Sequence, residues 1–122
     1  LHTDDLHILS KTSKGDKGMY GLIGKMRASR GQRDAVMEVL RASTSTGALP
    51  GCLSYIIARD PADADAIWVT EVWTDDESHK ASLQLPEVQA AIAKARPFIA
   101  GFEFQVETHP VGGFGLADGK KA

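Results

Sequence analysis

Three residues whose side chains can hold or move a proton lie within one short stretch, "TEVWTDDESH". Glu71 and Trp73 are alternate residues of an expected strand, and His79 follows six positions after the tryptophan in an expected helix. Alternate residues of a strand point to the same face, so Glu71 and Trp73 are expected to face one way. A neutral imidazole can exchange a proton near pH 7. His79 is therefore the candidate base, with Glu71 and Trp73 as its partners.

Each of these residues also has an ordinary structural interpretation. A salt bridge or a hydrogen bond to a nearby lysine, arginine or backbone donor would account for Glu71, because structural ion pairs are common among acids with apolar neighbours. Trp73 would simply fill the core at the end of its strand. His79 would be an exposed helical residue. What favours a shared site is the position of His79 just after Glu71 and Trp73.

Other chemistries lack their sequence signals. His79 and His109 are far apart and no HxxxH or CxxC pattern occurs, so no metal site is expected. Cys52 has no base beside it in the sequence and is expected to be a small buried residue. The segment "GGFGLADG" follows the last expected strand and opens no helix, so it does not match a dinucleotide-binding motif. We therefore expect no cofactor.

Hydrophobic periodicity predicts four strands and three helices in the order β-α-β-β-α-α-β. Two helix starts have the pattern of a capping box, Ser29 with Gln32 and Thr74 with Glu77. The first helix is expected to fade in "STSTG", and Pro86 is expected to begin the last one, which Pro97 ends or bends. The expected strands are Met19–Ser29, Cys52–Asp60, Ala66–Trp73 and Gly101–Val111.

This order predicts an α+β fold of the ferredoxin-like type, an antiparallel sheet with helices on one face. Strand residues of both faces are apolar, for example Ile67 and Val69 on one side and Trp68 and Val72 on the other. One layer of helices covers only one face. We therefore expect a homodimer whose sheets pack face to face. The domain is expected over residues 19–111, between an N-terminal extension of residues 1–18, native or added, and a C-terminal tail of residues 112–122.

The totals of the chain narrow the class of protein. Its 122 residues suit one domain, and 43% apolar and 25% charged side chains are typical of a globular protein. The net charge of −2 and the absence of a basic face argue against nucleic acid or an anionic membrane as partner. A single cysteine fits a reducing compartment. We expect a cytoplasmic protein.

The segments "PGCLSY", a "DP" turn, "EVWTDDESH", "LPEVQAAI" and a last strand running into "HPVGG" together resemble the antibiotic biosynthesis monooxygenase (ABM) family. The similarity covers Met19 to Gly113, and its most specific part is Glu71–x–Trp73 followed by His79. The resemblance implies a ferredoxin-like homodimer that forms a dimeric α+β barrel. For some members it also implies oxidation of quinols, anthrones and other electron-rich aromatics by O2 without metal, flavin or haem.

The chain departs from two branches of that family. Val69 stands where a polyketide-oxidising branch has an asparagine, and Ile92 lies near the place of that branch's helix arginine. The chain contains no asparagine, so the Asn–Trp–His set of the haem-degrading branch cannot form. These departures argue against anthrone oxidation and haem breakdown. A relative of the quinol-oxidising or sugar-signal-processing members remains open.

The resemblance and the residues together predict a cofactor-independent monooxygenase that acts with O2 on a small quinol, phenolic or enolic substrate. His79 is the expected base, Glu71 orients it, and Trp73 stacks on the substrate. Tyr55 and Phe98 are candidate substrate-binding residues. Two alternatives stay open: a cofactor-free isomerase of a small oxo-sugar that uses the same base, and a non-catalytic dimeric protein that binds small molecules.

Overall fold

The computed structural model describes residues 18–45 and 49–116. All of the predicted N-terminal extension except Gly18, and residues 117–122 of the predicted tail, lie outside the described residues. Within them, the elements in chain order are β1 (Tyr20–Ala28), α2 (Arg33–Thr44), β2 (Cys52–Arg59), β3 (Ala66–Trp73), α3 (Asp76–Ser82), α4 (Pro86–Ala95), the 3-10 turn η1 (Arg96–Phe98) and β4 (Ile99–Thr108).

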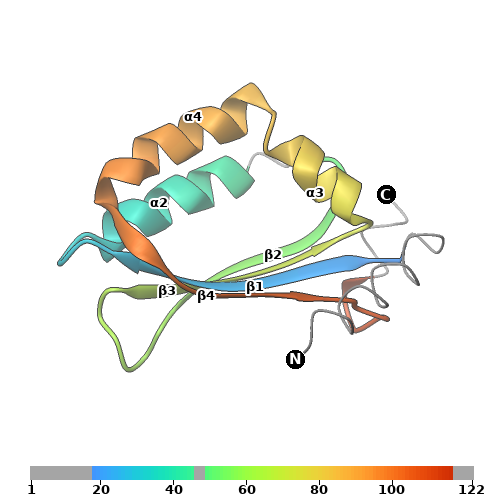
Figure 1. Ribbon diagram of the computed structural model, residues 1–122, viewed down its shortest axis with the longest axis horizontal. Coiled ribbons are helices and arrows are strands. Elements are labelled where there is room, and N and C mark those ends of the chain that lie inside the picture. Colours follow the sequence, from blue (N-terminus) through green and yellow to red (C-terminus); the bar gives the residue numbers. More distant parts are fainter. Residues whose placement is uncertain (1–17, 46–48, 117–122) are drawn as a thin grey trace, which may run out of the picture.

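The four strands form one antiparallel sheet in the order β2-β3-β1-β4. Helices α2, α3 and α4 all lie on one face of this sheet, and its other face carries no helix (Figure 1). The predicted α+β, ferredoxin-like fold with helices on one face is therefore confirmed. None of the described helices is long and apolar enough to cross a membrane.

Both predicted capping boxes are wrong in detail. Ser29 to Gln32 form a turn, in which Gly31 has a φ of +76°, and α2 begins only after Gln32, whose side chain caps nothing. The second helix is capped by Asp75, one residue later than predicted: its Oδ1 accepts a hydrogen bond of 2.8 Å from the Ser78 N–H. Thr74 is instead bonded to the turn before β2, because its N–H donates to the Gly51 carbonyl.

A β-bulge in β4 changes the predicted facing of its aromatic residues. The simple alternation placed Phe102, Phe104 and Val106 on one side. In the sheet, Lys25 pairs with Phe104 while the next residue, Met26, pairs with Phe102, so the pairing skips Glu103. Neighbouring strand residues face opposite ways and paired residues share a face. Phe102 therefore lies on the helix face, and Phe104 lies on the open face.

The core between sheet and helices has two parts. The larger one joins β1, β3 and α2 through buried aliphatic side chains: Ala28, Val36, Met37, Ile67 and Val69. The smaller one lies near the start of β1, where Tyr20, Leu22 and Trp73 pack together. Trp73 is only 1% exposed and is the largest fully buried side chain among the described residues. This second cluster forms the floor beneath α3.

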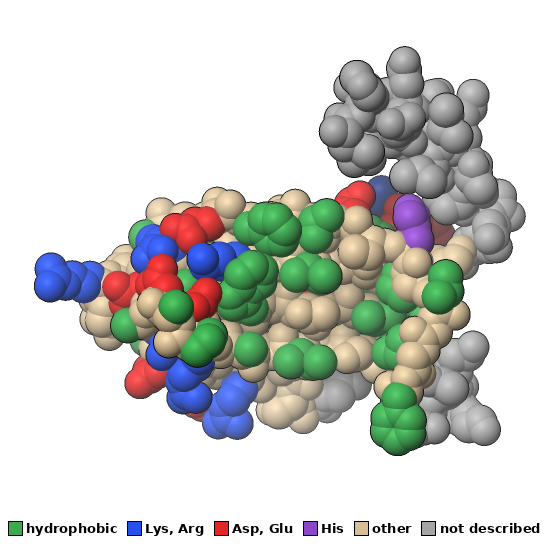
Figure 2. Space-filling model, turned by 90° about the horizontal axis from the view of Figure 1, so that it is seen from below, with side chains coloured by type: hydrophobic (Ala, Val, Ile, Leu, Met, Phe, Trp, Pro, Cys, Tyr) green, Lys and Arg blue, Asp and Glu red, His purple; other side chains and the backbone are tan. Residues whose placement is uncertain are grey.

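The open face of the sheet is largely apolar along its middle (Figure 2). Strand pairing places Ile23, Ile56, Trp68, Val72, Phe104 and Val106 on this face. Ile56 is 55% exposed and Phe104 is 48% exposed in the single chain. Exposed apolar residues gathered in one patch usually mark a surface that binds a partner. We refer to these six residues as the open sheet face.

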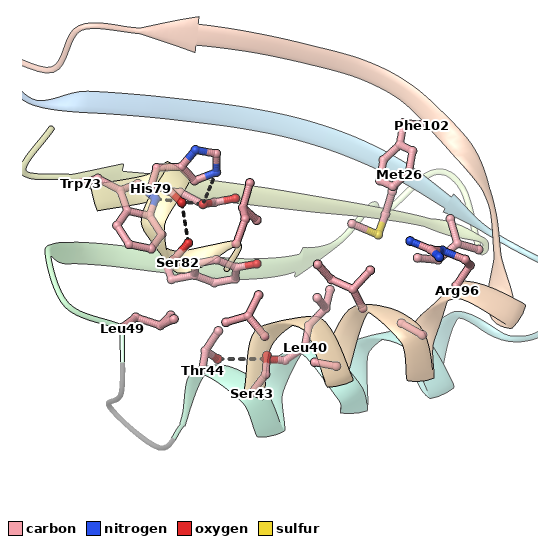
Figure 3. Close-up of a pocket in the computed structure, with 18 of the residues that line it drawn as sticks. Met26, Leu40, Ser43, Thr44, Leu49, Trp73, His79, Ser82, Arg96 and Phe102 are labelled. Atoms are coloured by element: carbon pink, nitrogen blue, oxygen red, sulfur yellow. Dashed lines mark hydrogen bonds and ion pairs between the residues drawn. The ribbon is translucent and has the colours of Figure 1, made fainter. Parts of the chain in front are cut away.

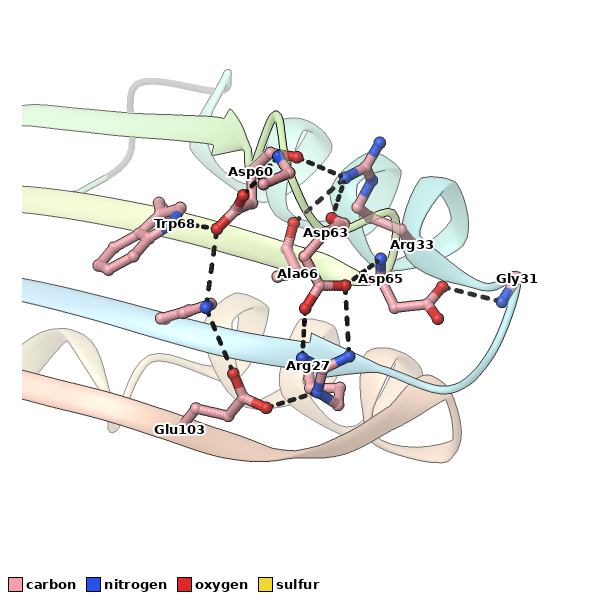
Figure 4. Close-up of polar contacts among 11 residues, drawn as sticks. Arg27, Gly31, Arg33, Asp60, Asp63, Asp65, Ala66, Trp68 and Glu103 are labelled. Atoms are coloured by element: carbon pink, nitrogen blue, oxygen red, sulfur yellow. Dashed lines mark hydrogen bonds and ion pairs between the residues drawn. The ribbon is translucent and has the colours of Figure 1, made fainter.

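One end of the sheet is tied together by charged side chains (Figure 4). Arg27 pairs with both Asp63 and Glu103, and Lys25 pairs with Asp60 and Glu103. The Arg27 hydrogen bonds lower the pKa values of Asp63 and Glu103. The network joins the β2–β3 turn to β1 and β4, and each of its acids has a cationic partner.

Candidate active site

A cavity of about 540 Å³ lies between the helix face of the sheet and helices α2, α3 and α4 (Figure 3). Ligand sites in proteins are typically of this size and mostly apolar, with a few placed polar groups. Most of the lining here is apolar, from residues such as Met26, Leu40, Leu49, Val88, Ile92 and Ile99. Trp73, His79 and Ser82 lie at one end, and Arg96 and Phe102 lie at the other.

Glu71 and Trp73 both face this cavity from β3, as their spacing predicts. The Trp73 Nε1–H donates a 2.9 Å hydrogen bond to Glu71 Oε1. Burial raises the pKa of the Glu71 carboxyl above its ordinary value, and the Trp73 hydrogen bond and nearby His79 only partly oppose this. No lysine or arginine among the described residues forms an ion pair with this acid, so the salt bridge that would explain it structurally is absent there.

His79 projects from α3 toward the same acid. Its Nε2 lies 3.8 Å from Glu71 Oε1, too long for a hydrogen bond but close enough for the carboxylate to stabilise a protonated ring. The imidazole stacks on the Tyr20 ring, with 5.2 Å between centroids, and meets the Trp73 ring edge-on at 5.5 Å. His79 is thus partly buried and held between two aromatic rings.

The start of α3 is fixed from two sides, which places His79. The Asp75 side chain caps the helix through the Ser78 N–H. Gly51 lies directly against the first turn, where a Cβ would meet the Ser78 Oγ at 2.5 Å, and its φ of +85° is one that glycine adopts without strain. At the other end of the helix, the Ser82 hydroxyl donates to the His79 carbonyl at 2.6 Å.

The two predicted substrate-binding residues have different locations. Tyr55 lines the cavity from β2, and burial followed by the charge of Glu71 raises the pKa of its hydroxyl, which therefore stays protonated at neutral pH. No described residue accepts a hydrogen bond from this hydroxyl, so it is available to a ligand. Phe98 does not line the cavity and packs against the larger core instead. We leave Phe98 out of the proposals below.

The sequence analysis missed two residues of this site. Tyr20 stacks on His79, and its hydroxyl donates a 2.9 Å hydrogen bond to Glu107 on β4. Tyr20 pairs with Trp73 because β1 lies beside β3 in the sheet. Hydrophobic periodicity does not predict which strands are neighbours. Arg96 lines the far end of the cavity from η1. The only signal for it was its place next to Pro97, at the end of the last helix.

Within the described ranges, no group of three or more histidine, cysteine, aspartate or glutamate side chains is arranged to hold a metal ion. Cys52 has a free thiol and packs against the small core of Tyr20, Leu22 and Trp73. Its pKa is raised by burial, which disfavours the reactive thiolate. Cys52 is therefore a poor candidate for a reactive group.

Comparison with known protein families shows which family the chain belongs to. The model of the antibiotic biosynthesis monooxygenase (ABM) family matches residues 19–94. The chain belongs to this family. The resemblance seen in the sequence is thereby confirmed. No curated protein matches the chain by sequence.

Solved structures support the same assignment. A Chloroflexus aurantiacus J-10-fl protein, provisionally named an antibiotic biosynthesis monooxygenase, is 61% identical with a TM-score of 0.76, covering 80% of this chain and 98% of that one. A provisionally named family member from Caulobacter crescentus CB15 is 20% identical with a TM-score of 0.72, over 79% and 92% of the two chains. SnoaB, a cofactor-independent oxygenase from Streptomyces nogalater, shares the fold at 12% identity and a TM-score of 0.67, over 80% and 97%.

Proposed function

We propose that this ABM-family protein is a cofactor-independent monooxygenase that oxidises a small quinol, phenolic or enolic substrate with O2. The observation that carries this proposal is the convergence of Glu71, Trp73 and His79 at one end of an otherwise apolar cavity. A cavity of about 540 Å³ has room for an aromatic ring system. Its apolar walls would remove water from the substrate and strengthen electrostatic interactions within it.

In this proposal His79 is the general base. It accepts the proton of the substrate hydroxyl, and the resulting imidazolium is stabilised by the Glu71 carboxylate 3.8 Å away. Trp73 anchors that carboxylate with its N–H and presents its ring to the cavity. The Tyr55 hydroxyl, protonated and without a partner among the described residues, donates a hydrogen bond to a substrate oxygen.

The substrate itself supplies the electrons. Its deprotonated, electron-rich ring passes one electron to O2, and the two radicals combine to form a carbon–oxygen bond. Loss of water then leaves one oxygen atom of O2 in the product and the other in H2O. For a hydroquinone the products are a hydroxyquinone and water, so all four electrons that reduce O2 come from the substrate. Such a reaction needs desolvation, orientation and a base from the protein.

An oxygen electrode tests the proposal directly. The purified protein should consume O2 with at least one member of a panel of benzene and naphthalene hydroquinones, faster than the buffer alone. Turnover of an oxo-sugar under nitrogen would instead support the isomerase, which uses the same base without O2. Tight binding of aromatics with no turnover in either gas would support a non-catalytic binding protein, and would overturn the oxygenase.

We also propose that two copies pack through the open sheet face. This face is apolar and uncovered in the single chain, and a two-fold related copy would remove both faces from water. Ile56→Lys places a charge within this face, on the edge strand β2, and is expected to yield monomers in sedimentation. Glu38→Lys, on the exposed side of α2, is the matched control and should leave the dimer intact. A wild-type chain that sediments as a monomer would contradict this assembly.

A further inference from the structure

Arg96 lies at the end of the cavity remote from His79 (Figure 3). It belongs to η1, directly after α4, and is the only lysine or arginine among the described residues that line the cavity. Figure 3 shows its guanidinium directed inward, toward Met26 and the cavity, rather than away from it. Arg96 is an exposed residue, so solvent also reaches this end of the cavity. The cavity thus has an acid and an imidazole at one end, a solvent-exposed permanent cation at the other, and apolar walls between them.

No carboxylate within the described ranges pairs with Arg96. The charged end of the sheet shows the opposite arrangement, because Arg27 there contacts two carboxylates, and Arg33 donates to three backbone carbonyls. A cation at the carbonyl end of α4 is favourable by itself, but that interaction does not require the guanidinium to face an apolar cavity. A guanidinium offers a planar fork that matches a carboxylate.

We infer that Arg96 is an anion-binding residue and that the substrate carries a carboxylate on the part of its aromatic body farthest from the reacting hydroxyl. This inference rests on the proposed function, since it takes the His79 end as the place where the substrate is deprotonated. It narrows the substrate class to aromatic hydroxy acids, with the hydroxyl beside His79 and the carboxylate beside Arg96. Leu40, Val88 and Ile92, which are among the apolar residues that line the cavity, would contact the ring system.

Two rigid probes test this inference by calorimetry under nitrogen. The first is 6-hydroxy-2-naphthoate, with a hydroxyl and a carboxylate at opposite ends, and the second is its neutral counterpart with a hydroxymethyl group in place of the carboxylate. A charge-assisted bidentate contact is expected to make the acid bind about tenfold more tightly than the alcohol. Arg96→Gln should abolish this preference, and Arg30→Gln, which removes an exposed arginine outside the cavity, should preserve it.

The outcomes separate this inference from the proposed function. A preference for the acid that depends on Arg96, found without any O2 consumption by the hydroquinones or by hydroquinones that carry a remote carboxylate, would support the anion site and contradict the oxygenase. O2 consumption without a preference for the acid would support the oxygenase and contradict the anion site. The anion site is overturned if neither probe binds, if wild-type protein binds both equally, if the preference survives Arg96→Gln, or if Arg30→Gln removes it as well.

Discussion

The sheet contains two tryptophan–carboxylate hydrogen bonds of the same length at opposite ends of β3. Trp68 donates to Asp60 at 2.9 Å, and Trp73 donates to Glu71 at 2.9 Å. The two acids nevertheless differ electrostatically. The Trp68 hydrogen bond, the Ala62 N–H and the Lys25 ammonium lower the pKa of Asp60. Burial raises the pKa of Glu71 despite its tryptophan.

We interpret this difference as a division between a structural end of the sheet and a reactive end. Asp60 belongs to a network in which Lys25 and Arg27 supply positive charge to each acid. Glu71 lies in an apolar cavity wall, with the titratable His79 imidazole 3.8 Å away. Buried acids with raised pKa values and an unfilled cavity beside them are frequent at functional sites. We therefore interpret the first end as structural and the second as the reactive one.

The largest expected effect is the loss of the imidazole at the reactive end. His79→Ala should lower kcat/KM for O2-dependent oxidation roughly 10²- to 10⁴-fold, because this is the typical contribution of a general base. The fold should persist by circular dichroism, since His79 is partly exposed. His109→Ala removes an exposed histidine outside the cavity and should leave the rate unchanged. Equal rates for wild type and His79→Ala would rule out this base.

Exchanging each tryptophan for phenylalanine compares the two hydrogen bonds directly. Trp73→Phe leaves Glu71 without its donor and is expected to lower kcat/KM about tenfold, the value of one charge-assisted hydrogen bond. Trp68→Phe removes the equivalent bond to Asp60 and should leave kcat/KM unchanged. Steady-state kinetics of both variants decide this. A larger loss in Trp68→Phe than in Trp73→Phe would reverse the interpretation of the two ends.

Neutralising the two acids should change stability in opposite directions. The raised pKa of Glu71 means that the folded state binds this proton more tightly, so stability is lost as pH rises through the folded pKa. Glu71→Gln should therefore raise the free energy of unfolding at pH 7, and raise it less at pH 4, where the carboxyl binds its proton in both states. Its kcat/KM should fall, because the imidazolium loses its counter-charge.

For Asp60, with a lowered pKa, the sign is reversed: its contribution is present at neutral pH and lost as pH falls through the folded pKa. Asp60→Asn should therefore destabilise the protein at pH 7. Urea unfolding of both variants at the two pH values measures these changes. Destabilisation of the protein by Glu71→Gln at pH 7 would show that Glu71 is a structural acid after all.

The regular elements could be predicted from the sequence because their limits are local. Strand β3 has the predicted limits, Ala66–Trp73, since a turn rich in aspartate precedes it and a helix cap follows it. The cap itself was misplaced by one residue because Thr74 and Asp75 are both good capping residues, and the contact of Thr74 with Gly51 decides between them. The facing of Phe102 was wrong because a bulge leaves no mark in an alternating pattern.

Residues of the candidate site could be predicted where their position follows from spacing along the chain. They could not be predicted where their position depends on the order of the strands in the sheet. Glu71 and Trp73 had to share a face, and the short turn after β3 could bring His79 toward them. Tyr20 reaches His79 only because β1 is the neighbour of β3, a long-range pairing with no local signal. Phe98 was predicted to bind substrate, but it packs against the larger core and does not line the cavity.

Isotope labelling tests the central claim most directly. Wild-type protein, treated with a chelator, would be given the best hydroquinone under labelled O2 gas, with a reciprocal run in labelled water to count oxygen exchanged with solvent. We predict one labelled oxygen atom in the product of the wild-type protein, and a rate of labelled-product formation roughly 10²- to 10⁴-fold lower with His79→Ala. A product whose new oxygen comes from water, or full labelled turnover by His79→Ala, would contradict base-assisted oxygenation at this cavity.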